Sequence, residues 1–201
     1  STTPKSEFAF IKIRTVNHLV FDDQEGARTT CHLFFDTGNI TDESSDTVAL
    51  IGMSDVVSDV ESDTCQMTCV IHNLNLAEKL QNMLQQRQTT HENLTKKYNN
   101  IMYDTTMGSH RPLPQLKPEH TLTVIVSHPH GCRKYVSFGN YTDREWVKGV
   151  WSQYNYTTPT CPGCSGALVF VLGHGKLLFD HAHVGNCVSN PSLNYSSYGV
   201  D

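Results

Sequence analysis

The chain has 201 residues, of which 38% are hydrophobic and 17% are charged, so it can bury one sizeable core or two small ones. Its net charge of -5 and the absence of a run of Lys or Arg exclude an electrostatic grip on nucleic-acid phosphates. Its longest apolar runs, such as Ala167 to Leu172, are far shorter than the roughly 20 residues that cross a bilayer. We therefore expect neither nucleic acid nor a membrane as a partner.

The first third of the chain carries patterns of β-strands. Apolar residues mixed with single polar ones over 8–14 and 30–35 favour two strands. The runs 48–52 and 65–71 favour two more. These segments predict a first all-β unit that ends near His72.

A helical pattern follows from Leu74 to Tyr103. Leu76, Leu80 and Met83 share one face, and the opposite side is rich in Gln. The spacing predicts an amphipathic helix that joins two halves of the molecule.

The remainder returns to β patterns after a proline-rich linker over 107–118. Strand-like runs cover 122–126, 135–138, 167–172 and 176–179, and Gly and Pro turns separate them. The second half is therefore expected to be β-rich as well.

Glycosylation motifs and cysteine usage both favour secretion. Five Asn-x-Ser/Thr sequons begin at Asn39, Asn93, Asn140, Asn155 and Asn194. The seven cysteines are scattered rather than paired at zinc-type spacing, so we expect disulfides with at least one thiol left over. Because residues 1–5 are polar, a secretory signal would have stood upstream and been removed.

A tight turn with the sequence CPGCSGA covers residues 161–167 and leads into an apolar strand. Glycines on both sides of a serine allow backbone N–H groups to converge on one point, as a tetrahedral oxyanion requires. Ser165 would be the nucleophile, and the N–H groups of Gly163 and Ser165 would form the oxyanion hole. The alternative is an ordinary turn between two strands.

A serine nucleophile needs a histidine base and a carboxylate that orients it. His18 directly follows the first strand, and Asp63 begins the strand-like segment 63–67. Each also has a structural interpretation, because a lone histidine at a strand end is more often structural and Asp63 lies in an acidic loop. Together with Ser165 they predict a catalytic triad.

Four segments resemble motifs of the trypsin-like serine peptidase family and occur in the family's order. TVNHLV (15–20) resembles the catalytic-histidine motif, and DTCQM (63–67) resembles the segment that supplies the acid. VIVSHPHG (124–131), followed by VSFG (136–139), is similar to the hairpin that opens the second barrel. PGCSGA (162–167) looks like the nucleophile loop.

The resemblance implies an all-β fold, a double β-barrel of the chymotrypsin type with the amphipathic helix inserted between the barrels. Residues 1–73 would form a first, partial barrel with the histidine and the aspartate, 74–118 a helical connection and linker, and 119–201 the second barrel with the nucleophile loop. It further implies a secreted serine endopeptidase that cleaves peptide or protein substrates through an acyl-enzyme, without a cofactor or a metal.

The nucleophile loop departs from the family pattern at one position. Cys164 stands where enzymes of the zymogen type carry an aspartate that pairs with a new N-terminus, so we expect a site formed without that ion pair. Viral relatives use a cysteine nucleophile in this loop, which makes Cys164 an alternative, although the register favours Ser165. The resemblance also implies a disulfide between Cys161 and Cys187.

The segment 177–186 resembles the wall of the primary specificity pocket and carries His181 and His183. A histidine can donate to a carboxylate or a carboxamide, so we expect a preference for Glu or Gln before the cleaved bond. Alternate residues of a strand share one face, so the two histidines could instead merely pack there. They could also bind zinc, although no third ligand is evident.

A full first barrel needs about two more strands than the residues before the first predicted strand provide, and an open barrel exposes strand edges. We expect a second chain from the same precursor to complete it, with the odd cysteine available for an interchain disulfide. The alternative function is a catalytically inactive homologue that serves as a binding or assembly subunit. A lectin-like or matrix β-protein would require the four ordered motifs to be coincidental.

Overall fold

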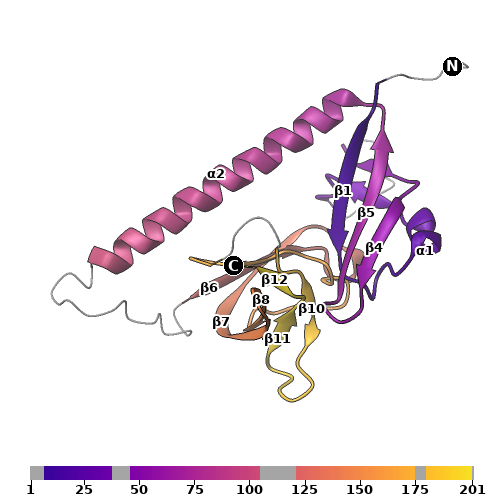
Figure 1. Ribbon diagram of the computed structural model, residues 1–201. Helices are drawn as coiled ribbons and strands as arrows, with labels where there is room; N and C mark the ends of the chain where they lie inside the picture. The colour runs from indigo at the N-terminus through magenta and orange to yellow at the C-terminus, as the bar shows by residue number, and fades with distance from the viewer. Residues whose placement is uncertain (1–6, 38–45, 105–120, 175–179, 201) are drawn as a thin grey trace, which may run out of the picture.

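The computed structural model describes residues 7–37, 46–104, 121–174 and 180–200. They form two β units joined by one long helix (Figure 1). The all-β class with an inserted helix is therefore confirmed. Within the described ranges, no helix is both long and apolar enough to cross a membrane.

The first unit combines a three-stranded antiparallel sheet of order β1-β5-β4 with a separate hairpin, β2-β3. Its elements are β1 (Ala9–Thr15), α1 (Asp23–Arg28), β2 (Cys31–Leu33), β3 (Val48–Leu50), β4 (Ser54–Asp59) and β5 (Thr64–Ile71). In the part of the chain that is described, these strands do not close into a barrel. The four predicted strands are present, whereas α1 and β4 were not predicted, because α1 has only six residues and β4 is mostly exposed.

The core of the first unit lies between the sheet, the hairpin and the start of the long helix. It is aliphatic and sulfur-rich: Val20, Leu50, Met53, Cys65, Met67, Cys69, Ile71 and Leu76. β1 alternates between half-buried and exposed positions, as a strand with one covered face must.

The long helix α2 (Leu74–Asp104) matches the predicted range of 74–103. The Asn73 side chain accepts from the backbone N–H of Leu76 at 3.1 Å, which satisfies one of the free donors of the first turn. Farther along, Arg87 forms an ion pair with Asp180 at 2.8 Å, and His91 contacts Phe170 edge to face. The helix therefore begins in the first core and then lies along the second unit (Figure 1).

The second unit is one sheet of order β10-β11-β8-β7-β6-β9, with β12 paired to β8. Its elements are β6 (Leu122–Ser127), the 3-10 turn η2 (Pro129–Gly131), β7 (Tyr135–Lys148), β8 (Trp151–Tyr156), β9 (Val169–Val171), β10 (His183–Asn186), β11 (Asn194–Ser196) and β12 (Gly199–Val200). An isolated bridge pairs Leu168 with Ala182, and the Val169 N–H donates to His181 O at 2.9 Å. The two ends of the sheet therefore meet.

The core of the second unit is aromatic where the first is aliphatic. It contains Ile125, Tyr141, Tyr154, Tyr156, Val169 and Val171. Several segments named in the sequence analysis, namely the linker 107–118, the strand 176–179 and the sequon at Asn39, lie outside the described residues.

Candidate active site

The carboxylate of Asp63 holds His18 at two points. Its Oδ2 lies 2.7 Å from His18 Nδ1, and its Oδ1 accepts from the His18 backbone N–H at 3.0 Å. An ionised carboxylate can only accept, so Nδ1 must carry the proton in this contact. In the neutral ring, Nε2 is then the free base.

His18 lies on a turn after β1, and Asp63 lies on a turn before β5. After β1, the Leu19 N–H donates to Val16 O at 3.2 Å, which forms a turn that carries His18. Asp63 lies just before β5 with a φ of 48°, a left-handed conformation that Asp and Asn adopt more readily than most residues. The His18 side chain is 42% exposed, so its ring can reach a substrate in the solvent.

The nucleophile loop consists of two successive turns around Ser165. The Cys164 N–H donates to Cys161 O at 3.0 Å, and the Ala167 N–H donates to Cys164 O at 3.1 Å. Gly163 has a φ of 93° and Gly166 a φ of 82°, conformations that side-chain-bearing residues rarely adopt. Both glycines predicted to shape this loop are therefore required by its backbone.

A neighbouring hairpin sets the direction of the Gly163 N–H. The His130 N–H donates to Pro162 O at 2.7 Å, and the described residues contain no cis peptide. In a trans peptide, N–H and C=O point in opposite directions, so the Gly163 N–H points away from His130. Within the described part of the chain, neither this N–H nor that of Ser165 donates to a protein acceptor. Two backbone donors are thus left available in the loop.

Close packing docks the loop on both β units. A Cβ added to Gly163 would lie 2.8 Å from the His130 backbone nitrogen. A Cβ added to Gly166 would lie 2.4 Å from Thr15 Oγ1, at the end of the strand that leads to His18. The residue after Ser165 therefore touches the segment that carries the histidine.

Ser165 and Cys164 point in different directions. Cys164 is 1% exposed, and its sulfur lies 3.3 Å from Ser127 Oγ and accepts from the Cys161 N–H at 3.4 Å. The Ser165 hydroxyl is only partly buried and donates to Val184 O at 3.4 Å. The geometry therefore disfavours Cys164 as the nucleophile, because its sulfur faces the interior.

The two pocket histidines have different surroundings. His183 Nδ1 lies 2.7 Å from the Tyr156 hydroxyl, and burial, followed by the nearby positive charge of His18, lowers the pKa of His183 to about 4. His181 stacks on Tyr154 with ring centroids 3.8 Å apart, and its Nε2 lies 3.2 Å from Ser152 Oγ. Both histidines are 3% exposed, and the role of either in reading the substrate stays a prediction.

The predicted disulfide between Cys161 and Cys187 is not formed, since all seven cysteines are free thiols. Cys161 is exposed, whereas the Cys187 thiol donates to Asn155 Oδ1 at 3.4 Å. Burial, and then the neighbouring Glu145, raise the pKa of the Cys187 thiol. Among the described residues, no three His, Cys, Asp or Glu side chains gather in a way that could hold a metal ion.

The sequons divide into exposed and buried sites. Asn93 on α2 and Asn140 on β7 are exposed. Asn155 is 9% exposed and donates to Glu145 Oε1 at 3.1 Å, and Asn194 is 4% exposed and donates to Thr158 O at 2.7 Å. The predicted glycosylation of Asn155 and Asn194 does not fit this fold, because both amide nitrogens are engaged and enclosed.

Two residues of the site were not found from the sequence. Tyr156 lies in the alternating segment WSQYNY, a strand pattern that could have placed it on an inner face. His130 acts through its backbone at a φ of 54°, and only the glycine that follows it hinted at a turn.

No family model matches the chain, and no curated protein matches it significantly. Among solved structures, it is similar to an inactive form of Rv3671c from M. tuberculosis, with 10% identity, a TM-score of 0.44, and coverage of 92% of this chain and 70% of that one. It is also similar to the active form of the Rv3671c protease, with 11% identity, a TM-score of 0.39, and coverage of 94% and 74%.

Proposed function

We propose that the chain is a serine endopeptidase with His18, Asp63 and Ser165 as its triad. The observation that carries the proposal is the double contact of Asp63 with His18, which leaves Nε2 as a base while the adjoining loop presents a serine and two available N–H groups. A carboxylate that grips both the ring and the backbone of a histidine orients the base as triad chemistry requires.

The proposed reaction has two stages, acylation and deacylation of Ser165. His18 Nε2 takes the proton of Ser165 as Oγ attacks the scissile carbonyl, and the N–H groups of Gly163 and Ser165 stabilise the oxyanion. The imidazolium then gives its proton to the leaving amine, and the carbonyl reforms as an acyl-serine. Water, deprotonated by His18, hydrolyses that ester and restores Ser165.

A second candidate function is an inactive homologue that serves as a binding subunit. It is favoured by one contact, the donation of the Ser165 hydroxyl to Val184 O rather than to His18. Catalysis requires this hydroxyl to turn toward Nε2, and catalytic hydrogen bonds often tighten only when substrate is bound.

We further propose that His183 selects Glu or Gln before the cleaved bond. With a pKa of about 4, its ring is neutral near pH 7. In the arrangement we propose, the Tyr156 proton goes to Nδ1 at 2.7 Å rather than to Tyr195 O at 3.2 Å, which leaves the Nε2–H of His183 to donate to a side-chain oxygen. Cleavage of a peptide library mainly after Lys, Arg or Phe would contradict this specificity.

Secretion and a second chain from the same precursor also stay proposals. The exposed sequons at Asn93 and Asn140 support secretion. Support for a partner that completes the first unit comes from β1, an edge strand of the described sheet: Phe10 on this strand and Phe8 just before it are both exposed. A homogeneous monomer in native mass spectrometry of the protein from its source would contradict the proposed second chain.

A fluorophosphonate probe tests the catalytic proposal directly, because it labels serines that a neighbouring base has activated. We expect labelling of Ser165 that disappears in Ser165→Ala and persists in Cys164→Ala and after iodoacetamide treatment. Absence of labelling in protein with native circular dichroism would favour the inactive homologue.

A further inference from the structure

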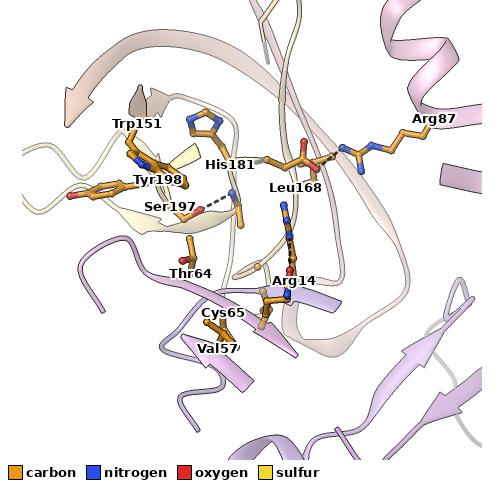
Figure 2. Close-up of a pocket in the computed structure, with 15 residues that line it drawn as sticks. Arg14, Val57, Thr64, Cys65, Arg87, Trp151, Leu168, His181, Ser197 and Tyr198 are labelled. Carbon is orange, nitrogen blue, oxygen red and sulfur yellow. Dashed lines mark hydrogen bonds and ion pairs between the residues drawn. The ribbon is translucent and has the colours of Figure 1, made fainter. Parts of the chain in front are cut away.

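Two adjoining hollows lie at the junction of the β units, next to the triad but not lined by it. The first has a volume of about 400 Å³ and is lined by residues of β1, β5, α2 and the second unit (Figure 2). The second has a volume of about 300 Å³. Thr64, Trp151 and Tyr198 line both hollows, so the two lie side by side, and together we call them the junction groove.

The two ends of the junction groove carry opposite charge. Arg14, Arg87 and Asp180 line the first hollow, where Arg87 is paired with Asp180 at 2.8 Å, and the three formal charges sum to one positive. Figure 2 shows both arginines on the side away from Trp151 and Tyr198. The charged residues of the second hollow are Asp59, Glu61 and Lys148, and their formal charges sum to one negative.

An aromatic wall separates the two charged ends. Trp151 and Tyr198 lie together in this part of the groove (Figure 2). The wall is fixed to both β units, because the Tyr198 N–H donates to Ser62 O at 3.2 Å and β12 pairs Val200 with Trp151. Aromatic side chains held in this way offer an apolar contact surface at low conformational entropy.

We propose that the junction groove binds an extended peptide segment of a partner protein. Such a segment would place an acidic residue near Arg14 and Arg87, an apolar or aromatic residue against Trp151, and a basic residue near Glu61. The first hollow alone lies in the size range of small-molecule pockets. A compact anion, however, would leave the second hollow and its opposite charge unused, whereas an extended peptide reaches both.

The junction groove is distinct from the site of the proposed reaction. His18, Asp63 and Ser165 do not line it, although Thr64 and Gly166 directly follow two of them in the chain. Its occupancy can therefore be measured whether or not the protein hydrolyses peptides.

Tryptophan fluorescence gives a direct readout, because the chain has only two tryptophans. Trp146 is 59% exposed and lies outside the groove, so the variant Trp146→Phe leaves Trp151 as the single reporter. We would titrate this variant, combined with Ser165→Ala to prevent cleavage, with the peptide acetyl-Lys-Leu-Phe-Leu-Asp-amide. The matched control is the uncharged peptide acetyl-Gln-Leu-Phe-Leu-Asn-amide.

We expect a saturable change in Trp151 emission, with the uncharged peptide binding about 10-fold more weakly. Arg14→Gln and Glu61→Gln should each weaken the charged peptide by about 3-fold to 5-fold. Arg133→Gln removes a basic residue that does not line the groove and should leave binding unchanged.

Three results would overturn the proposal: no saturable change, equal binding of the two peptides, or insensitivity to both groove substitutions. A response to Arg14→Gln without one to Glu61→Gln would also overturn it, since it would indicate a site for a small anion.

Discussion

The two β units support the candidate site in different ways. The first has a core of aliphatic side chains and thiols, and it presents His18 and Asp63 on turns at the ends of strands. The second encloses Tyr154, Tyr156 and two histidines, so its interior is built from polar aromatic groups. The first unit therefore supports the exposed His18–Asp63 pair on an apolar core. The second unit contains hydrogen-bonded polar aromatic groups within its core.

This difference has an energetic reason. Buried polar groups destabilise a fold unless they are hydrogen-bonded, and a satisfied network in turn fixes the geometry of its members. Tyr156 and His183 satisfy each other next to the nucleophile loop, so the second unit can hold a neutral histidine beside the candidate catalytic serine.

The largest effect is expected in the first unit, from Asp63→Asn. An asparagine tolerates the φ of 48° but can present an amide N–H to Nδ1, which favours the wrong tautomer of His18. We expect kcat to fall by about 10⁴-fold with little loss of stability. Asp55→Asn is the matched control, because Asp55 also has a positive φ, of 51°, and makes no contact with His18. Equal loss of activity in the two variants would refute the orienting role.

In the second unit, Gly163→Ala should lower kcat by about 10²-fold to 10³-fold through the loss of one oxyanion donor. The new Cβ would meet the His130 backbone nitrogen at 2.8 Å and shift the loop. Gly149→Ala provides the control, since Gly149 also has a positive φ but no atom within 4 Å of the added Cβ. Kinetics of a chromogenic ester measure both variants. Unchanged kcat in Gly163→Ala would remove this residue from the oxyanion hole.

The neutral state of His183 predicts a pH dependence of stability. The unfolded histidine binds a proton near pH 6.5, whereas the folded one does so only near pH 4. Acidification from pH 6.5 to 4 therefore favours the unfolded state, by about 3 kcal/mol in all, and the contribution vanishes above pH 6.5. His183→Gln should flatten this part of the curve in urea titrations. An identical pH dependence in the variant would mean that a group other than His183 takes up the proton on unfolding.

The smallest effect concerns glycans. Expressed through the secretory pathway of a glycosylating host, the protein should carry glycans at Asn93 or Asn140 and none at Asn155 or Asn194. The reason is that the last two amide nitrogens are engaged inside the second unit. Intact mass before and after enzymatic deglycosylation of the single Asn→Gln variants decides this. A glycan on Asn194 would mean that β11 is not packed as described.

Much of the site was predictable because its parts lie within short segments. His18, Asp63 and the glycines around Ser165 each lie at a turn that can be recognised from neighbouring residues. The order of these segments along the chain then led to the hypothesis of a catalytic triad. Features that depend on tertiary distance could not be predicted in this way. A bond between Cys161 and Cys187 requires two sulfurs to meet, and a glycan on Asn194 requires an open surface, and a local motif encodes neither.

The fold followed the same division. Alternating and helical periodicities predicted β1, β5 and α2, because each pattern reports one covered face. β4 was missed because it is mostly exposed, and β8 was missed although WSQYNY alternates in the manner of a strand. The different surroundings of His181 and His183 depend on tertiary packing, which a local pattern does not encode.

The hydrogen bond from the His130 N–H to Pro162 O fixes the peptide plane between Pro162 and Gly163 from within the second unit. On the proposed function, the direction of this oxyanion donor therefore does not depend on an ion pair with a newly formed N-terminus.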